Sequence, residues 1–127
     1  MDDKKQQIVK PEPGDIYLDV LQQADQRLKP RPVLVLKQSP QPSQARFRFD
    51  NYVVVGLSSM LYQEVSGFDV FIEPSPSNGL EKKSLTRTAF VGYVSENLMI
   101  EYLGFIDDSV CNTVANRLAS YLLNSVN

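Results

Sequence analysis

One cation of the chain, Arg31, lies between two prolines at the start of an aliphatic run, KPRPVLVL (Lys29 to Leu36). Pro30 and Pro32 fix their own φ angles, and each disfavours helical backbone in the residue before it. The backbone direction of Arg31 is therefore largely preset. A guanidinium is a planar, permanently charged fork that donates to two oxygens of an oxyanion at once. By spacing alone, a surface salt bridge at a sheet edge is the commoner role of such an arginine; the alternative is an arginine positioned for a phosphate.

A pair of hydroxyls follows a second apolar run, VVVGLSS (Val53 to Ser59). Ser58 and Ser59 stand where the chain leaves this run and must turn. A hydroxyl there can hydrogen-bond a phosphate or an attacking oxygen. The alternative is a local hydrogen bond to the backbone that starts the turn, a common role of serine.

Other chemistries are restricted by composition. The chain has no histidine, so it lacks the most common general acid or base near neutral pH and the usual zinc ligand. The single cysteine, Cys111, forms no internal disulfide and offers no metal-site spacing. Asp107 and Asp108 form a carboxylate pair, but capping of the helix that follows them needs fewer assumptions than acid-base work.

The whole chain predicts one small domain. Its 127 residues are 43% hydrophobic and 22% charged, with a net charge of −2, which argues against a strongly basic nucleic-acid coat. No apolar run approaches the roughly 20 residues that span a membrane. The polar start, MDDKKQQIVKPEP, lacks a secretory apolar region, so we expect a flexible arm over 1–13, a domain over 14–127 and a cytoplasmic location.

The elements that must position these residues are mostly strands. Alternating or continuous apolar runs predict strands over 16–21, 32–36, 45–56, 68–72, 84–94 and 101–106, with a polar loop over 22–30 and a short helical turn over 95–99. Capping candidates at 107–109 precede an apolar stripe made by Val110, Val114, Leu118 and Leu122, widened by Cys111, Ala115 and Tyr121. The predicted fold is mainly β, a small barrel-like sheet with a C-terminal helix.

Five blocks of the sequence resemble one known family. They are GDIYLDV (Gly14 to Val20), RPVLVL (Arg31 to Leu36), VVVGLSS (Val53 to Ser59), Gly79-Leu80 and LGFID (Leu103 to Asp107). Their order and approximate spacing resemble those of the MazF/PemK toxins of type II toxin-antitoxin systems, over roughly Pro13 to Leu122. The resemblance implies an SH3-like barrel of the CcdB/MazF/PemK type, a homodimer, and a cognate antitoxin that holds the toxin in check.

The activity that the resemblance implies is metal-independent cleavage of single-stranded RNA, without a cofactor. In the family, an arginine before a proline and a hydroxyl residue after the third strand carry the chemistry, and these match Arg31 and Ser58. Cleavage through the 2′-hydroxyl builds negative charge on the phosphorane oxygens, which a pre-positioned guanidinium stabilises. Ser59 is a second hydroxyl candidate.

The chain departs from the family at its first loop. A glutamate common there corresponds, by its offset from Arg31, to Gln26, which cannot accept a proton. The general base is thus unassigned, and the neighbouring Asp25 is a candidate only if the loop shifts by one residue. Gln26 remains a candidate RNA contact together with the cations Arg27, Lys29, Lys82, Lys83 and Arg87. The alternative for the Lys82 group is a solvated basic face.

Two other functions fit the same fold. One is a binding module that keeps the groove of the family but has lost its base. The other is a gyrase poison of the CcdB type, which the absence of tryptophan disfavours because that resemblance calls for a C-terminal tryptophan.

Overall fold

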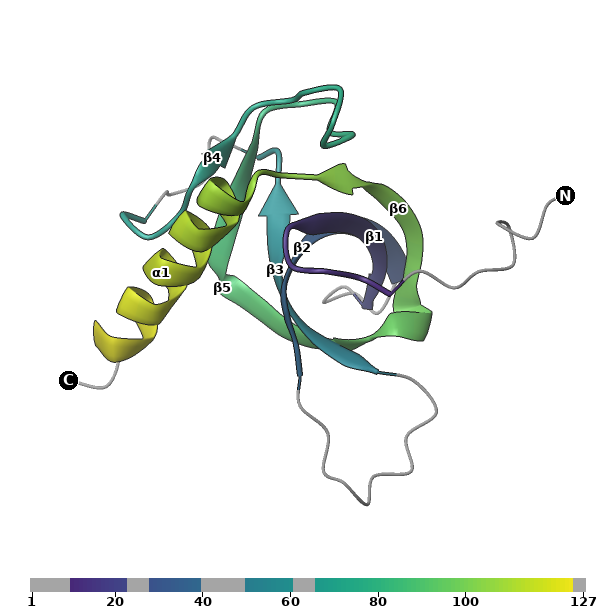
Figure 1. The fold of residues 1–127 in the computed structure, drawn as a ribbon, viewed down its shortest axis with the longest axis horizontal. Coiled ribbons are helices and arrows are strands. Elements are labelled where there is room, and N and C mark those ends of the chain that lie inside the picture. The colour runs from purple at the N-terminus through teal and green to yellow at the C-terminus, as the bar shows by residue number, and fades with distance from the viewer. Residues whose placement is uncertain (1–9, 23–27, 40–49, 61–65, 125–127) are drawn as a thin grey trace, which may run out of the picture.

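The computed structural model describes residues 10–22, 28–39, 50–60 and 66–124 (Figure 1). The elements are β1 (Asp15–Gln22), β2 (Leu28–Gln38), β3 (Asn51–Ser58), β4 (Phe71–Ile72), β5 (Ser84–Ser95), the 3₁₀ turn η2 (Glu96–Leu98), β6 (Met99–Phe105) and α1 (Asp108–Asn124). The short helical turn predicted over 95–99 is therefore confirmed as η2.

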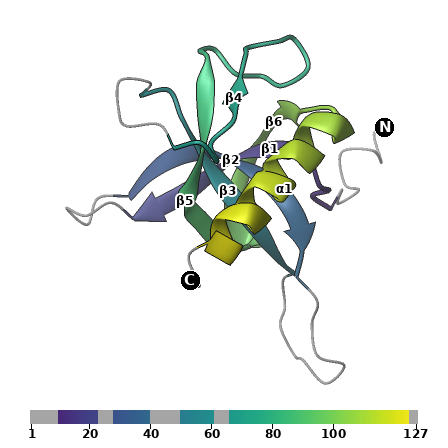
Figure 2. The ribbon, with the colours of Figure 1, turned by 90° about the vertical axis from the view of Figure 1, so that its left-hand side faces the viewer.

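The described strands form a single antiparallel sheet in the order β4-β5-β3-β2-β1-β6. The sheet curls strongly, so β6 wraps round beside β1 while α1 lies along one side next to β5 (Figures 1 and 2). This arrangement confirms the predicted fold class, mainly β with a small barrel-like sheet and a C-terminal helix. No helix among the described residues is long and apolar enough to cross a membrane.

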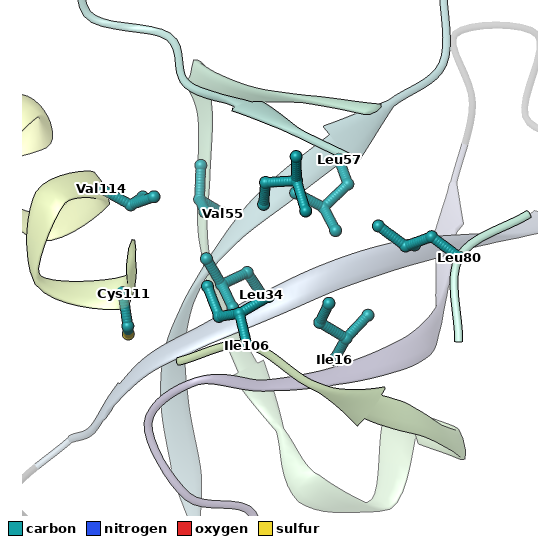
Figure 3. Packing of buried hydrophobic residues seen from close by; sticks show 9 residues of the cluster. Ile16, Leu34, Val55, Leu57, Leu80, Ile106, Cys111 and Val114 are labelled. Carbon is teal, nitrogen blue, oxygen red and sulfur yellow. The ribbon is translucent and has the colours of Figure 1, made fainter. Parts of the chain in front are cut away.

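Both faces of the sheet are buried, because side chains alternate along each strand. The first cluster packs between the sheet and α1 (Figure 3), and its members are Ile16, Leu34, Val55, Leu57, Ile72, Leu80, Ile106, Cys111 and Val114. The second cluster covers the opposite face with Val33, Val35, Tyr52, Val54, Val94 and Met99. Successive residues of β2 and β3 therefore enter different clusters, which explains why their sequences read as continuous apolar runs.

Most of the predicted apolar stripe of α1 is confirmed. Cys111, Val114 and Leu118 are its buried residues, spaced three and four apart on one face. The prediction is wrong for Leu122, which is 52% exposed, and for Ala115, which is also exposed. The stripe therefore ends before the last turn of α1.

The observed strand bounds differ from the predicted ones, and the differences at β2 and β3 are the larger ones besides that at β4. β2 begins at Leu28 rather than Pro32, so the predicted loop over 22–30 is wrong at its end. Pairing of β2 with β3 starts only at Val33, and the prolines before it therefore interrupt no hydrogen bonds between these two strands. β3 runs to Ser58, whereas most of its predicted first half, 45–49, lies outside the described residues.

β4 is shorter than the predicted 68–72, because one backbone hydrogen bond, from the Thr86 amide to the Val70 carbonyl, and side-chain contacts replace regular pairing before Phe71. The Val70 amide donates to Thr86 Oγ1 at 2.9 Å, and the Thr88 amide donates to Asp69 Oδ1 at 3.0 Å. These contacts tie the segment before β4 to β5 without regular pairing. Only Phe71 and Ile72 pair as a strand with β5.

The chain is held to the sheet before β1 begins. Lys10 Nζ lies 3.0 Å from a carboxylate oxygen of Asp50 and 3.0 Å from one of Glu96, and Pro11 is buried. The predicted arm, 1–13, falls outside the described residues up to residue 9. Its last residues contact the start of β3 and η2.

Candidate functional site

Arg31 lies in β2 directly opposite Asp19 of β1. Directly opposed residues of an antiparallel pair have their side chains on the same face of the sheet. Tyr17 and Val33 form another opposed pair of these two strands, and both pack in the second cluster. Asp19 and Arg31 therefore extend this face beyond its apolar part.

Ser58 reaches the same face from β3. Val33 and Gly56 form the last pair between β2 and β3, and Arg31 and Ser58 each lie two residues beyond that pair, so alternation puts both side chains on this face. Arg31 and Ser58, which 26 other residues separate in the sequence, thus lie on the same face of two adjacent strands. We call Asp19, Arg31 and Ser58 the polar row.

The hydroxyl of Ser58 also shapes the chain behind it. Ser58 is the last residue of β3, and its Oγ accepts a hydrogen bond from the Met60 amide at 3.1 Å. This is the local turn contact that the sequence left open as an alternative, and it leaves the hydroxyl proton available to another acceptor. Ser59 follows the strand and is exposed.

Asp19 was not predicted as a site residue. It is 1% exposed, although a carboxylate is rarely buried so completely. Its neighbour across β6 is Met99 of the second cluster, and its neighbour across β2 is Arg31. Its alternation with the apolar Ile16 and Leu18 in IYLDVL could have indicated that Asp19 points to the other face of the strand. The sequence does not place Asp19 opposite Arg31, because it gives no register between β1 and β2.

Arg87 lies opposite Gly56 on the same face, but it is buried and ion-paired. Its Nη1 lies 3.4 Å from Asp69 Oδ2, with side-chain exposures of 11% for Arg87 and 5% for Asp69. The same carboxylate accepts from the Thr88 amide and hydroxyl, at 3.0 and 3.1 Å. Arg87 is therefore not part of a solvated basic face, and RNA contact by it stays a prediction.

The lysines before β5 do lie at the surface. Lys82 is exposed, and Lys83 Nζ lies 3.4 Å from a carboxylate oxygen of Glu73 and 4.7 Å from the centre of the Phe71 ring. Asp25, Gln26 and Arg27 lie outside the described residues, and for Lys29 only the backbone in β2 is described.

Other reactive side chains are less suited to catalysis. Burial raises the pKa of the Cys111 thiol above its ordinary value, so the reactive thiolate is disfavoured near neutral pH. Burial likewise raises the pKa of the Tyr17 phenol to about 12. Within the described ranges, no three His, Cys, Asp or Glu side chains are grouped so as to hold a metal ion.

Comparison with solved structures supports the fold. An endoribonuclease from a Mycobacterial species, solved in complex with its cognate antitoxin, matches with a TM-score of 0.63 and 18% identity, covering 89% of this chain and 95% of that chain. The Mycobacterium tuberculosis toxin MazF-mt6 matches with a TM-score of 0.57 and 20% identity, covering 84% and 93%. A comparison with curated proteins gives no match.

Comparison with protein-family models extends over most of the domain. The model described as "PemK-like, MazF-like toxin of type II toxin-antitoxin system" matches residues 12–122, from the segment before β1 to the last turns of α1. This range contains the whole polar row and all of the described strands. The chain therefore belongs to the PemK-like, MazF-like toxins of type II toxin-antitoxin systems.

Proposed function

We propose that this protein is a metal-independent endoribonuclease toxin that cleaves single-stranded RNA, including mRNA, and is neutralised by a cognate antitoxin. The observation that carries the proposal is that Arg31 and Ser58 lie on the same face of the adjacent strands β2 and β3, each two residues beyond the last pair, Val33–Gly56. In a chain of this family, these are the positions that match the cation and the hydroxyl of the chemistry.

The cleavage step follows from RNA itself. The 2′-oxygen attacks the adjacent phosphorus, the bond to the 5′-oxygen breaks, and a 2′,3′-cyclic phosphate and a 5′-hydroxyl remain. Negative charge grows on the non-bridging oxygens of the transition state, and Arg31 donates to them. Ser58 orients the phosphate or the 2′-oxygen with its hydroxyl. The proton of the 2′-hydroxyl passes to a base for which Asp25 is the candidate, and the departing 5′-oxygen takes a proton from water.

The partners follow the same reasoning. One similar structure is an endoribonuclease in complex with its cognate antitoxin, and we propose a corresponding antitoxin for this chain. We also propose that the toxin acts as a homodimer in the cytoplasm. Gln26, Arg27, Lys29, Lys82 and Lys83, with Arg87, are the proposed RNA contacts outside the polar row.

The test is cleavage of a long, largely unstructured RNA by the purified protein in the presence of EDTA, read by primer extension. Wild-type protein should give discrete cuts, and Arg31→Ala should reduce the cleavage rate by on the order of a hundredfold or more, because the transition-state charge loses its donor. Lys37→Ala, which removes an exposed cation from the same strand, is the matched control and should cut like wild type.

Two results would contradict the proposal. A folded Arg31→Ala protein with the full cleavage rate would remove Arg31 from the chemistry. A folded wild-type protein that binds RNA but makes no cuts would instead favour the binding module without a base.

A further inference from the structure

We propose that Asp19 is a positioning residue for Arg31: its buried carboxylate orients the guanidinium toward the scissile phosphate. The inference rests on the proposed function, because it concerns the same polar row. The family resemblance gives Asp19 no role in the chemistry, and this proposal adds one.

The position of Asp19 supports this role. It lies directly opposite Arg31 in the β1–β2 register, on the same face of the sheet, and it is 1% exposed. Of its two cross-strand neighbours, Met99 is apolar and Arg31 is cationic. Removing a carboxylate from water is strongly unfavourable unless charge and hydrogen bonding compensate it, which favours a close approach to the guanidinium.

The geometry of a guanidinium permits both contacts at once. It carries five N–H donors in one plane, so one edge can face a carboxylate while the remaining donors face phosphate oxygens. Because Asp19 is almost fully buried, RNA does not reach its carboxylate in this structure. Asp19 therefore acts through Arg31 and is not itself a catalytic residue.

The surroundings of Asp19 do not by themselves call for an acid at this position. A carboxylate beside a phosphate-binding arginine lowers the positive potential that attracts RNA. The same face of β2 continues with Val33 and Val35, which shows that apolar side chains fit it. The carboxylate of Asp19 instead fixes the direction of the Arg31 guanidinium. A misplacement of such a group by about 1 Å can cost roughly a hundredfold in rate.

The first measurement is steady-state cleavage of a short oligoribonucleotide by the full chain. Asp19→Asn, which removes the charge with little change of shape, should lower kcat by about tenfold to a hundredfold while KM changes by less than about threefold. Asp15→Asn is the matched control on the same strand. The Asp15 carboxylate accepts from the Glu12 amide at 2.9 Å, away from the polar row, and its substitution should leave kcat unchanged.

A second variant separates positioning from folding. Removing the carboxylate leaves the Arg31 cation without it, so Asp19→Val should unfold at a lower urea concentration than wild type, and its cleavage is measured at a temperature where it is folded. If Asp19 served only the fold, Asp19→Val would cleave RNA at the wild-type rate. A folded Asp19→Val protein with the same loss of kcat as Asp19→Asn supports positioning.

The third measurement does not depend on RNA. Urea unfolding of wild type, Asp19→Asn, Arg31→Ala and the double variant forms a double-mutant cycle, in which we expect non-additivity of at least about fivefold in the unfolding equilibrium constant. An additive cycle would show that the two side chains do not interact, and it would overturn the proposal whatever the cleavage activity.

The outcomes distinguish the two proposals. Wild-type cleavage with equally active Asp19→Asn and Asp19→Val proteins overturns the positioning role and leaves the nuclease intact. If wild type cuts no RNA, the nuclease fails, and with it any positioning for cleavage, while the cycle still decides whether Asp19 holds Arg31.

Discussion

Ser58 illustrates how one hydroxyl can serve both the fold and the chemistry. Its Oγ accepts from the Met60 amide, and Ser58 lies on the same face of the sheet as Arg31. We expect Ser58→Ala to lower kcat by about tenfold to a hundredfold, because the phosphate or the 2′-oxygen loses an orienting hydrogen bond. Loss of the turn contact should lower the free energy of unfolding by only about 1 kcal/mol.

Ser58→Thr is the matching control, because it keeps the hydroxyl and adds one methyl group. It should retain at least about a third of the wild-type kcat, given a rotamer that keeps the hydroxyl in place. Ser59→Ala tests the neighbouring candidate. If Ser59→Ala lost more activity than Ser58→Ala, the assignment of the catalytic hydroxyl to Ser58 would be wrong.

The reactivity of Cys111 can be predicted from its place in the first cluster. It is buried against the sheet, its thiol pKa is raised by burial, and its Sγ lies 3.9 Å from the Val35 carbonyl oxygen. At pH 8 the native protein should react with a disulfide reagent at least about tenfold more slowly than the urea-unfolded chain, since both access and thiolate are restricted. Equal rates in the two states would mean that α1 detaches readily.

At the scale of elements, Asp69 holds the segment before β4 against β5. It accepts hydrogen bonds from Thr88 and pairs with the buried Arg87. Asp69→Ala leaves that cation without this carboxylate, so we expect the free energy of unfolding to fall by about 3 kcal/mol. Urea unfolding followed by tyrosine fluorescence measures the change. Glu101→Ala, at an exposed position of β6, is the control and should change the free energy of unfolding by less than about 0.5 kcal/mol.

The turn between β4 and β5 depends on one glycine. Gly79 has a φ of +69°, and a Cβ built there would lie 2.1 Å from the Leu103 carbonyl oxygen. Gly79→Ala combines an unfavourable backbone conformation with a clash against backbone, so it should cost more than about 2 kcal/mol of stability. Gly67→Ala meets nothing within 4 Å and is the control. Comparable stabilities of the two variants would contradict the close approach of this turn to β6.

At the scale of the whole molecule, the tyrosines link stability to alkaline pH. Burial raises the pKa of Tyr17 from 10.0 to about 12, and it raises the pKa values of Tyr52 and Tyr102 as well. Between the unfolded and the folded pKa, the folded protein binds more protons than the unfolded chain. Stability is therefore fully present below pH 10 and falls as the pH rises toward 12.

Tyr17→Phe should make the loss of stability between pH 10 and pH 12 less steep, because it removes one of the groups that titrate late. Urea unfolding midpoints at several pH values measure the slope, and tyrosinate absorbance follows the titration itself. An unchanged slope in Tyr17→Phe would show that this phenol titrates alike in both states.

Much of the architecture could be predicted from local sequence. Period-two alternation and continuous apolar runs predicted most of the strands, and the spacing of Cys111, Val114 and Leu118 predicted the buried side of α1. Leu122 has the same spacing but lies beyond the surface that the sheet offers, so periodicity alone overextended the stripe. The start of β2 at Leu28 was missed because polar residues before the prolines read as a loop, whereas pairing with β1 extends the strand.

The candidate site divides in the same way. The sequence by itself determined the residue types and their restraint: an arginine fixed by two prolines, a hydroxyl at the end of an apolar run, and no histidine. Only the tertiary structure decided that Arg31 and Ser58 share one face of adjacent strands, that Asp19 is buried opposite Arg31, and that Arg87 is paired with Asp69. Proline and alternation act within a few residues, whereas register joins distant segments, and a slip of one residue would turn every side chain to the other face.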